Sequence, residues 1–190
     1  MIKILAFSGS NRKDSANKKM LEIAAKGARE AGAEVSVVHL EDFDLPMFSE
    51  DVEAQGMPEG VLAFKKLMLA HDGLMIASPE YNSAYSPLLK NAIDWASRQT
   101  EQNEKPLSAY NGKFAVIMAA SPGALGGMRG LAALRMLLSN IKVNVLANQV
   151  TLGGAFQAFN EDSLSLVNPK KQQSIEALGA QLAQMLQSQR

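Results

Sequence analysis

The sequence contains no cysteine and only two histidines, His39 and His71. The absence of cysteine excludes disulfide bonds, thiolate metal sites and a catalytic thiol. Because no cysteine accompanies the two histidines, the sequence also argues against a metal centre and against a hydrolase built on a Ser-His-Asp triad. We therefore expect both histidines to be structural or surface residues.

The chain also lacks an excess of charge of either sign, since 19 basic side chains balance 19 acidic ones. With 47% hydrophobic residues and no net charge, it is typical neither of a disordered segment nor of a nucleic-acid-binding surface. No hydrophobic run approaches the ~20 residues of a membrane span, and no signal segment precedes the first apolar run. We expect a cytoplasmic protein with a small-molecule partner and no nucleic-acid or membrane partner.

What is present is a regular alternation of short apolar runs and helical patterns. The runs expected to form strands are residues 2–7, 34–39, 73–78, 113–120 and 143–152. The last of these runs forms either one strand or an interrupted strand. Apolar residues recur at helical spacing after each run. Strands separated by helices pair in parallel, so we predict a single α/β domain over residues 1–190, with a five-stranded parallel sheet between two helical layers.

Several residues in these patterns carry further expectations. Trp95 is interpreted as a core residue or as an oligomer contact. Residues 40–57 are expected to be a polar connection that forms the rim of a site or a solvated loop, and residues 153–169 an exposed loop. The methionines that lie in strand or helix patterns are expected to fill the core: Met20, Met68, Met75, Met118 and Met136.

The loop after the first strand, residues 9–17, reads Gly-Ser-Asn-Arg-Lys-Asp-Ser-Ala-Asn. A helix that begins near Ser15 would place its unpaired N–H groups and positive dipole end at this loop. Ser10, Ser15 and Asn17 can donate hydrogen bonds to phosphate oxygens, and Arg12 adds a charge-assisted contact. The loop therefore predicts a phosphate site, with a ligand-free turn capped by Ser15 as the alternative.

Two further unusual loops also follow strands. Residues 79–86 follow the third strand and begin Pro-Glu-Tyr-Asn, and residues 121–127 follow the fourth and read Ser-Pro-Gly-Ala-Leu-Gly-Gly. In doubly wound sheets, ligands bind at the carboxyl ends of the strands at a topological switch point, as in sheets of order 2-1-3-4-5. We therefore expect one composite site, in which Glu80 meets backbone or solvent rather than acting as a general base.

Together these loops resemble the NADPH-dependent FMN reductase family, which includes bacterial quinone, chromate and azo-dye reductases. Residues 9–17 are similar to its G-S-x-R-x-x-S-x-N loop. Residues 79–82 and 87–95 are similar to its P-E-Y-N motif and the helix that follows, P-x-x-L-K-N-A-I-D-W. Ser121-Pro122-Gly123 and the glycine pair at 126–127 match its third loop, and the resemblance extends over essentially the whole chain.

The resemblance implies a flavodoxin-like three-layer α/β/α fold, with a five-stranded parallel sheet of order 2-1-3-4-5, and a bound FMN. Residues of the first loop would hold the FMN phosphate: Ser10, Arg12, Ser15, Ala16 and Asn17. Residues of the second loop would border the ribityl chain and the flavin ring: Pro79, Glu80, Tyr81 and Asn82. Ser121 and Gly123 would close the other side of the ring.

The reaction implied is hydride transfer from NADPH or NADH to FMN, followed by electron transfer to a quinone, flavin, azo compound or metal oxyanion in a ping-pong scheme. The flavin carries the chemistry, so no catalytic side chain is expected. One alternative is an NADPH:FMN reductase that releases reduced flavin, and another is a flavodoxin-type electron carrier, which the neutral net charge disfavours. The resemblance also implies a homodimer or homotetramer.

Overall fold

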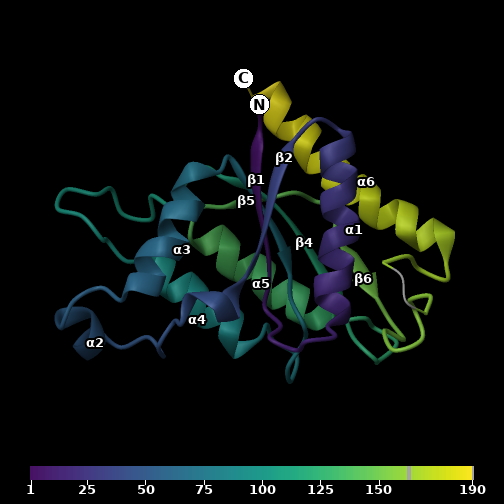
Figure 1. Cartoon of the computed structure of the whole chain (residues 1–190), viewed down its shortest axis with the longest axis horizontal. Helices are drawn as coiled ribbons and strands as arrows, with labels where there is room; N and C mark the ends of the chain where they lie inside the picture. Colours follow the sequence, from purple (N-terminus) through teal and green to yellow (C-terminus); the bar gives the residue numbers. More distant parts are fainter. Residues whose placement is uncertain (162–163, 190) are drawn as a thin grey trace.

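The computed structural model describes residues 1–161 and 164–189, in which a parallel β-sheet forms the centre (Figure 1). Its strands are β1 (Lys3–Ser8), β2 (Glu34–His39), β3 (Gly73–Ala77), β4 (Phe114–Ala120), β5 (Asn144–Val145) and β6 (Val150–Leu152). The strand order is β2-β1-β3-β4-β5, and β6 pairs with β4 beyond β5. The predicted order 2-1-3-4-5 is confirmed, with a sixth strand added.

The sixth strand arises because the apolar run at residues 143–152 is interrupted. Both halves pair with β4, β5 near its start and β6 near its end. The Arg135 guanidinium holds the segment between them, donating hydrogen bonds to the Val145 carbonyl (3.1 Å) and to Gln149 Oε1 (3.0 Å). The two short strands therefore continue one edge of the sheet as the interrupted strand that the sequence allowed.

Helices cover both faces of the sheet (Figure 1). α1 (Ala16–Glu30) and α6 (Pro169–Ser188) pack on one face, and α3 (Glu59–Ala70), α4 (Pro87–Ser97) and α5 (Met128–Asn140) pack on the other. Side chains of β1 alternate between the two cores, with Ile4 and Ala6 facing α1 and α6, and Leu5 and Phe7 facing the opposite layer. Both cores therefore share the central strands, as the continuous apolar runs predict.

α1 and α6 approach each other closely through glycines. A Cβ atom on Gly27 of α1 would lie 2.0 Å from the Glu176 carbonyl oxygen, and one on Gly179 of α6 would lie 1.9 Å from the Ala24 carbonyl oxygen. Real Cβ contacts are never this short, so only glycine permits the spacing. The small residues of α1 thus serve contact with a second helix as well as with the sheet.

Residues 40–57 are more ordered than the predicted polar connection. They contain a 3₁₀ turn, η1 (Leu40–Phe43), and a short helix, α2 (Glu50–Ala54). Trp95 of α4 is fully buried and donates a hydrogen bond from Nε1 to the Pro46 carbonyl (2.7 Å), while its ring packs edge-on against Phe48. Trp95 is therefore a core residue that fastens this segment to α4.

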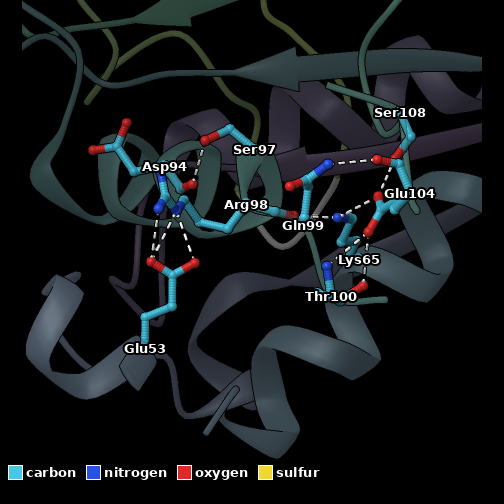
Figure 2. A network of polar contacts seen from close by, with 9 residues as sticks. All are labelled: Glu53, Lys65, Asp94, Ser97, Arg98, Gln99, Thr100, Glu104 and Ser108. Atoms are coloured by element: carbon cyan, nitrogen blue, oxygen red, sulfur yellow. Dashed lines mark hydrogen bonds and ion pairs between the residues drawn. The ribbon is translucent and has the colours of Figure 1, made fainter. Parts of the chain in front are cut away.

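Ion pairs reinforce the same side of the molecule, as Figure 2 shows. Arg98, just after α4, contacts Glu53 of α2 at 2.8 Å. Lys65 of α3 is buried and contacts Glu104 at 2.5 Å, and Ser108 donates a further hydrogen bond to Glu104. The segment that joins α4 to β4 is thereby bound to α3.

Two expectations about buried residues need correction. Met20, Met68, Met75 and Met118 are buried as predicted, but Met136 is 72% exposed, because it lies on the outer side of α5. The segment at 153–169 is not wholly exposed: Ala155 and Leu166 join the core shared with α1 and α6. Within the described residues no helix is long and apolar enough to cross a membrane.

Candidate functional site

The loop at residues 9–17 joins β1 to α1 and is fixed at both ends. Ser15 is the N-cap of α1, and its hydroxyl oxygen accepts a hydrogen bond from the Lys18 N–H (3.3 Å). Gly9 has no room for a side chain, since a Cβ there would lie 2.6 Å from Ser86 Oγ. The Ser86 hydroxyl also donates a hydrogen bond to the Gly9 carbonyl (2.5 Å). The loop is thus held against the start of α4.

The first turn of α1 presents groups suited to an anion. Ala16 and Asn17 open the helix, so their N–H groups have no acceptor within it, and no described residue elsewhere accepts from them. Ser10 and Ser15 stand beside these N–H groups with little solvent exposure. Because the Ser15 hydroxyl oxygen only accepts within the cap, its proton is available to a ligand. This donor set matches the requirements of a phosphate group.

Arg12 adds positive charge to the loop. Its side chain forms no ion pair within the described part of the chain, and its guanidinium lies 5.9 Å from the centre of the Phe156 ring. The neighbouring carboxylate of Asp14 pairs instead with Lys19 at 2.6 Å. The hydrogen bond and charge of Lys19 lower the pKa of Asp14, and the charge of Arg12 adds a smaller contribution in the same direction. The charge of Arg12 therefore remains available to a ligand.

The second loop is a tight hairpin. Tyr81 and Ala84 exchange backbone hydrogen bonds of 2.9 and 3.0 Å. The two residues between them, Asn82 and Ser83, have positive φ angles of 52° and 68°, as in a type I′ turn. Asparagine tolerates this left-handed conformation better than most residues. Two backbone hydrogen bonds therefore close the turn at the tip of this loop.

Glu80 connects this hairpin to α5. Its carboxylate Oε2 accepts a hydrogen bond from the Gly130 N–H (2.8 Å) in the first turn of α5. That helix has Gly127 at its N-cap and no side-chain cap of its own, so Glu80 supplies an acceptor and a favourable charge. The expectation that Glu80 meets backbone is confirmed.

The third loop follows β4 and contacts the end of the sheet. The Ser121 N–H donates to the Leu152 carbonyl (3.0 Å), and the Ala155 N–H donates to the Ser121 carbonyl (3.2 Å). Gly126 and Gly127 have positive φ angles of 61° and 92°, which glycine adopts without strain. The loop thereby lies beside the segment that follows β6.

The three loops meet in a cleft of about 110 Å³ at the carboxyl edge of the sheet. Among the residues predicted from sequence, those that line the cleft are Ser10, Arg12, Ser15, Ala16, Asn17, Pro79, Glu80, Tyr81 and Ser121. Asn82 lies at the exposed hairpin tip and Gly123 on the outside of the third loop, so neither lines the cleft. Direct contact of these residues with a cofactor stays a prediction.

Three lining residues escaped the sequence analysis, namely Ala120, Ala155 and Phe156, and a further one, Pro122, lies in the predicted third loop without having been assigned to the site. Phe156 is 67% exposed and, with Arg12, also borders a wider cavity of about 660 Å³ beside α1. It follows the carboxyl end of β6 by four residues. Sites form at the carboxyl ends of parallel strands, and this rule predicts Phe156 as a site residue once residues 150–152 are recognised as a separate strand.

Both histidines lie away from the cleft lining. His71 is buried, with Nδ1 2.7 Å from the Leu67 carbonyl oxygen and Nε2 2.9 Å from Ser36 Oγ. His39 is exposed at the end of β2. One is therefore a structural residue and the other a surface residue, as expected.

Comparison with known proteins gives a consistent result. Residues 2–157 match the family described as NADPH-dependent FMN reductase. An NAD(P)H-dependent FMN reductase of Pseudomonas aeruginosa is 36% identical over 181 residues, which cover 93% of each chain. A quinone reductase of Pseudomonas putida is 35% identical over 170 residues, covering 89% of this chain and 86% of the relative.

Among solved structures, the flavoenzyme NAD(P)H:acceptor oxidoreductase FerB of Paracoccus denitrificans is similar throughout. The two share a TM-score of 0.83 and 28% identity, covering 99% of this chain and 98% of the other. The strand order and the helical layers agree with a flavodoxin-like fold. Fold, loop motifs and sequence identity lead to one assignment: the chain belongs to the NADPH-dependent FMN reductase family and is an oxidoreductase that uses FMN and a nicotinamide donor.

Proposed function

We propose that this chain oxidises NADPH or NADH at a bound FMN and passes the electrons to a quinone or related acceptor by a ping-pong mechanism. Relatives named quinone reductase support the quinone as acceptor. Flavins, azo compounds and metal oxyanions belong to the same proposal as further acceptors. Membership of a family of reductases favours these enzymatic functions over a role as an electron carrier.

FMN, when bound, supplies the hydride-accepting and electron-donating chemistry. The chain's own residues would bind and orient it. The first-turn N–H groups of α1, the hydroxyls of Ser10 and Ser15, and Arg12 would hold the phosphate. The hairpin at Pro79–Tyr81 and the third loop at Ser121 would border the ring.

The observation that carries this proposal is the guanidinium of Arg12, which forms no ion pair within the described residues, beside the N–H groups of α1 that have no acceptor there, at the meeting point of three loops. A dianionic phosphate complements that arrangement, whereas a neutral ligand would leave it unused. The two flanking loops supply walls on either side.

Stopped-flow reduction of the FMN-loaded protein tests the proposal. Mixing with NADPH or NADH should bleach the flavin absorbance before any acceptor is present, and a panel of quinones should then restore it. Steady-state plots at several quinone concentrations should give parallel lines, because the oxidised nicotinamide leaves first. Failure to bind FMN, or no bleaching by either nicotinamide, would refute the proposal.

The shape of the cleft favours a second candidate, release of reduced FMN as the product. The cleft of about 110 Å³ shares Arg12, Ala16, Ala155 and Phe156 with the wider cavity beside α1, so part of a bound FMN would stay exposed on that side. Gel filtration of the loaded protein separates the two functions. Retention of stoichiometric FMN supports the resident cofactor, and its loss supports release.

A further inference from the structure

Asn17 forms a hydrogen-bonded bridge between α1 and the end of β4. Its Nδ2 donates to the Ala120 carbonyl at 3.0 Å, and its Oδ1 accepts from the Ala120 N–H at 2.9 Å. The Asn17 side chain is buried, and the two residues are 103 positions apart in sequence. This Asn17–Ala120 bridge joins elements that carry different loops of the candidate site.

The bridge supplies hydrogen bonds to the end of β4 at a point beyond the end of its neighbour β3. The last hydrogen bond between the β3 and β4 chains runs from the Ser78 N–H to the Met118 carbonyl (2.9 Å). Beyond Ser78 the chain turns away into the hairpin, and no backbone group of this segment pairs with Ala120 in the described residues. The N–H and carbonyl of Ala120 would then lack a partner, and the Asn17 amide satisfies both, as a peptide group of a neighbouring strand would.

We propose that Asn17 is a positioning residue for the flavin site, which acts through Ala120 rather than through side-chain contact with the phosphate. The inference rests on the proposed FMN function. The side-chain amide of Asn17 already donates through Nδ2 and accepts through Oδ1 in its hydrogen bonds with Ala120. The backbone N–H of Asn17 is the group that would donate a hydrogen bond to the phosphate. The bridge fixes the first turn of α1 relative to the point where the second and third loops leave the sheet.

This role makes a prediction that differs from that of a phosphate ligand. Loss of a phosphate ligand weakens the binding of FMN but not of riboflavin, which lacks the phosphate. Loss of a positioning residue displaces the loops that border the ring, weakens both flavins, and destabilises the protein before any flavin binds, because two buried backbone groups lose their partners.

The test uses Asn17→Leu, which keeps the approximate size of the side chain and removes its hydrogen bonds. The melting temperature of the flavin-free chain should fall by about 4–8 °C. The dissociation constants for FMN and riboflavin should rise by similar factors, so that their ratio changes less than about threefold. Arg12→Ala is the contrasting variant and should weaken FMN selectively. Asn140→Leu removes an exposed amide at the end of α5 and should leave the melting temperature within about 1 °C.

A selective loss of FMN binding in Asn17→Leu, with an unchanged melting temperature, would overturn the inference. If Asn17→Leu does not fold, Asn17→Asp replaces it. The introduced carboxyl group faces the Ala120 carbonyl, so its ionised form is unfavourable, and the melting-temperature deficit of the flavin-free chain should shrink as the pH falls from 7 to 5. A deficit that is absent or independent of pH would also overturn the inference. Wild-type chain that binds neither flavin would instead refute the proposed function, while the melting measurements still test the bridge.

Discussion

Arg12 carries a positive charge that forms no ion pair within the described part of the chain, at the mouth of a cleft lined by hydroxyls. Such a charge is stabilised most by a doubly charged ligand group that the planar guanidinium can bind through two hydrogen bonds. Its contact with Phe156 restricts the guanidinium without taking up its hydrogen-bond donors. The side chain is therefore suited to phosphate recognition.

Removal of this charge gives a prediction for a single residue. Arg12→Ala should weaken FMN binding by roughly 1.5–3 kcal/mol, the scale of a lost charge-assisted hydrogen bond. Isothermal titration calorimetry of the flavin-free chain measures the change. Lys13→Ala removes a neighbouring exposed charge that does not line the cleft and should have a much smaller effect. Equal affinities for wild type and Arg12→Ala would show that the phosphate lies elsewhere.

At the scale of elements, the contact between α1 and α6 depends on two glycines. Gly27→Ala or Gly179→Ala would place a methyl group within about 2 Å of a backbone carbonyl oxygen, which cannot move without separating the helices. Each variant should lower the free energy of unfolding by about 1–3 kcal/mol in urea denaturation, although alanine is the better helix former. Ala177→Gly, on the exposed side of α6, measures the difference in helix propensity alone and should lower the free energy of unfolding by about 1 kcal/mol. A stabilised Gly179→Ala variant would contradict the close contact.

The ion pair between α3 and the following linker gives a pH-dependent prediction. Burial by itself raises the pKa of Glu104, but hydrogen bonds from Lys65 and Ser108 outweigh it and lower the pKa to about 2, from an ordinary value of 4.5. Because the folded state holds this carboxyl ionised, its stabilisation is complete above pH 4.5 and is lost as the pH falls towards 2. Glu104→Gln should therefore cost roughly 3 kcal/mol at pH 7.

Urea denaturation of wild type and Glu104→Gln at several pH values measures this cost. The difference between the two should narrow as the pH falls from 5 towards 2. Glu101→Gln changes an exposed carboxylate in the same linker and should stay near wild type throughout. A difference that persists unchanged in acid would mean that Glu104 stabilises the fold by packing rather than by charge.

For the whole molecule, we predict a homodimer or homotetramer. Large apolar side chains are exposed around the cleft, namely Tyr81, Leu125, Met128 and Phe156, and a second copy of the chain would cover them. Light scattering after gel filtration should give a multiple of the monomer mass, and Met128→Lys should shift the population towards monomer. A monomeric wild type at all concentrations would contradict this prediction.

The sheet order and the meeting of the three loops could be predicted from the sequence because both follow from local patterns. Alternating apolar runs and helical spacing define a parallel sheet, and the loops after its strands must meet at one edge. Ser15 could be identified as an N-cap from its position before the helical pattern. These features depend on residues close together in the chain.

The features that escaped prediction depend on contacts distant in sequence. Trp95 reaches the Pro46 carbonyl across 49 positions and orders a segment that reads as a polar loop. Asn17 reaches Ala120 across 103 positions, so its local motif shows only a polar amide. Met136 fits a helical pattern, but which side of a helix faces solvent is decided by the layer against which it packs.

The contact between α1 and α6 also determines how much of the chain must be synthesised before the fold can be completed. α1 is complete by residue 30, whereas its partner α6 begins at residue 169. During translation one apolar side of the nascent chain therefore stays uncovered long after the opposite layer, which ends with α5 at residue 140, has been synthesised. Partly made chains should expose this apolar side to chaperones and to one another until the final helical segment covers it.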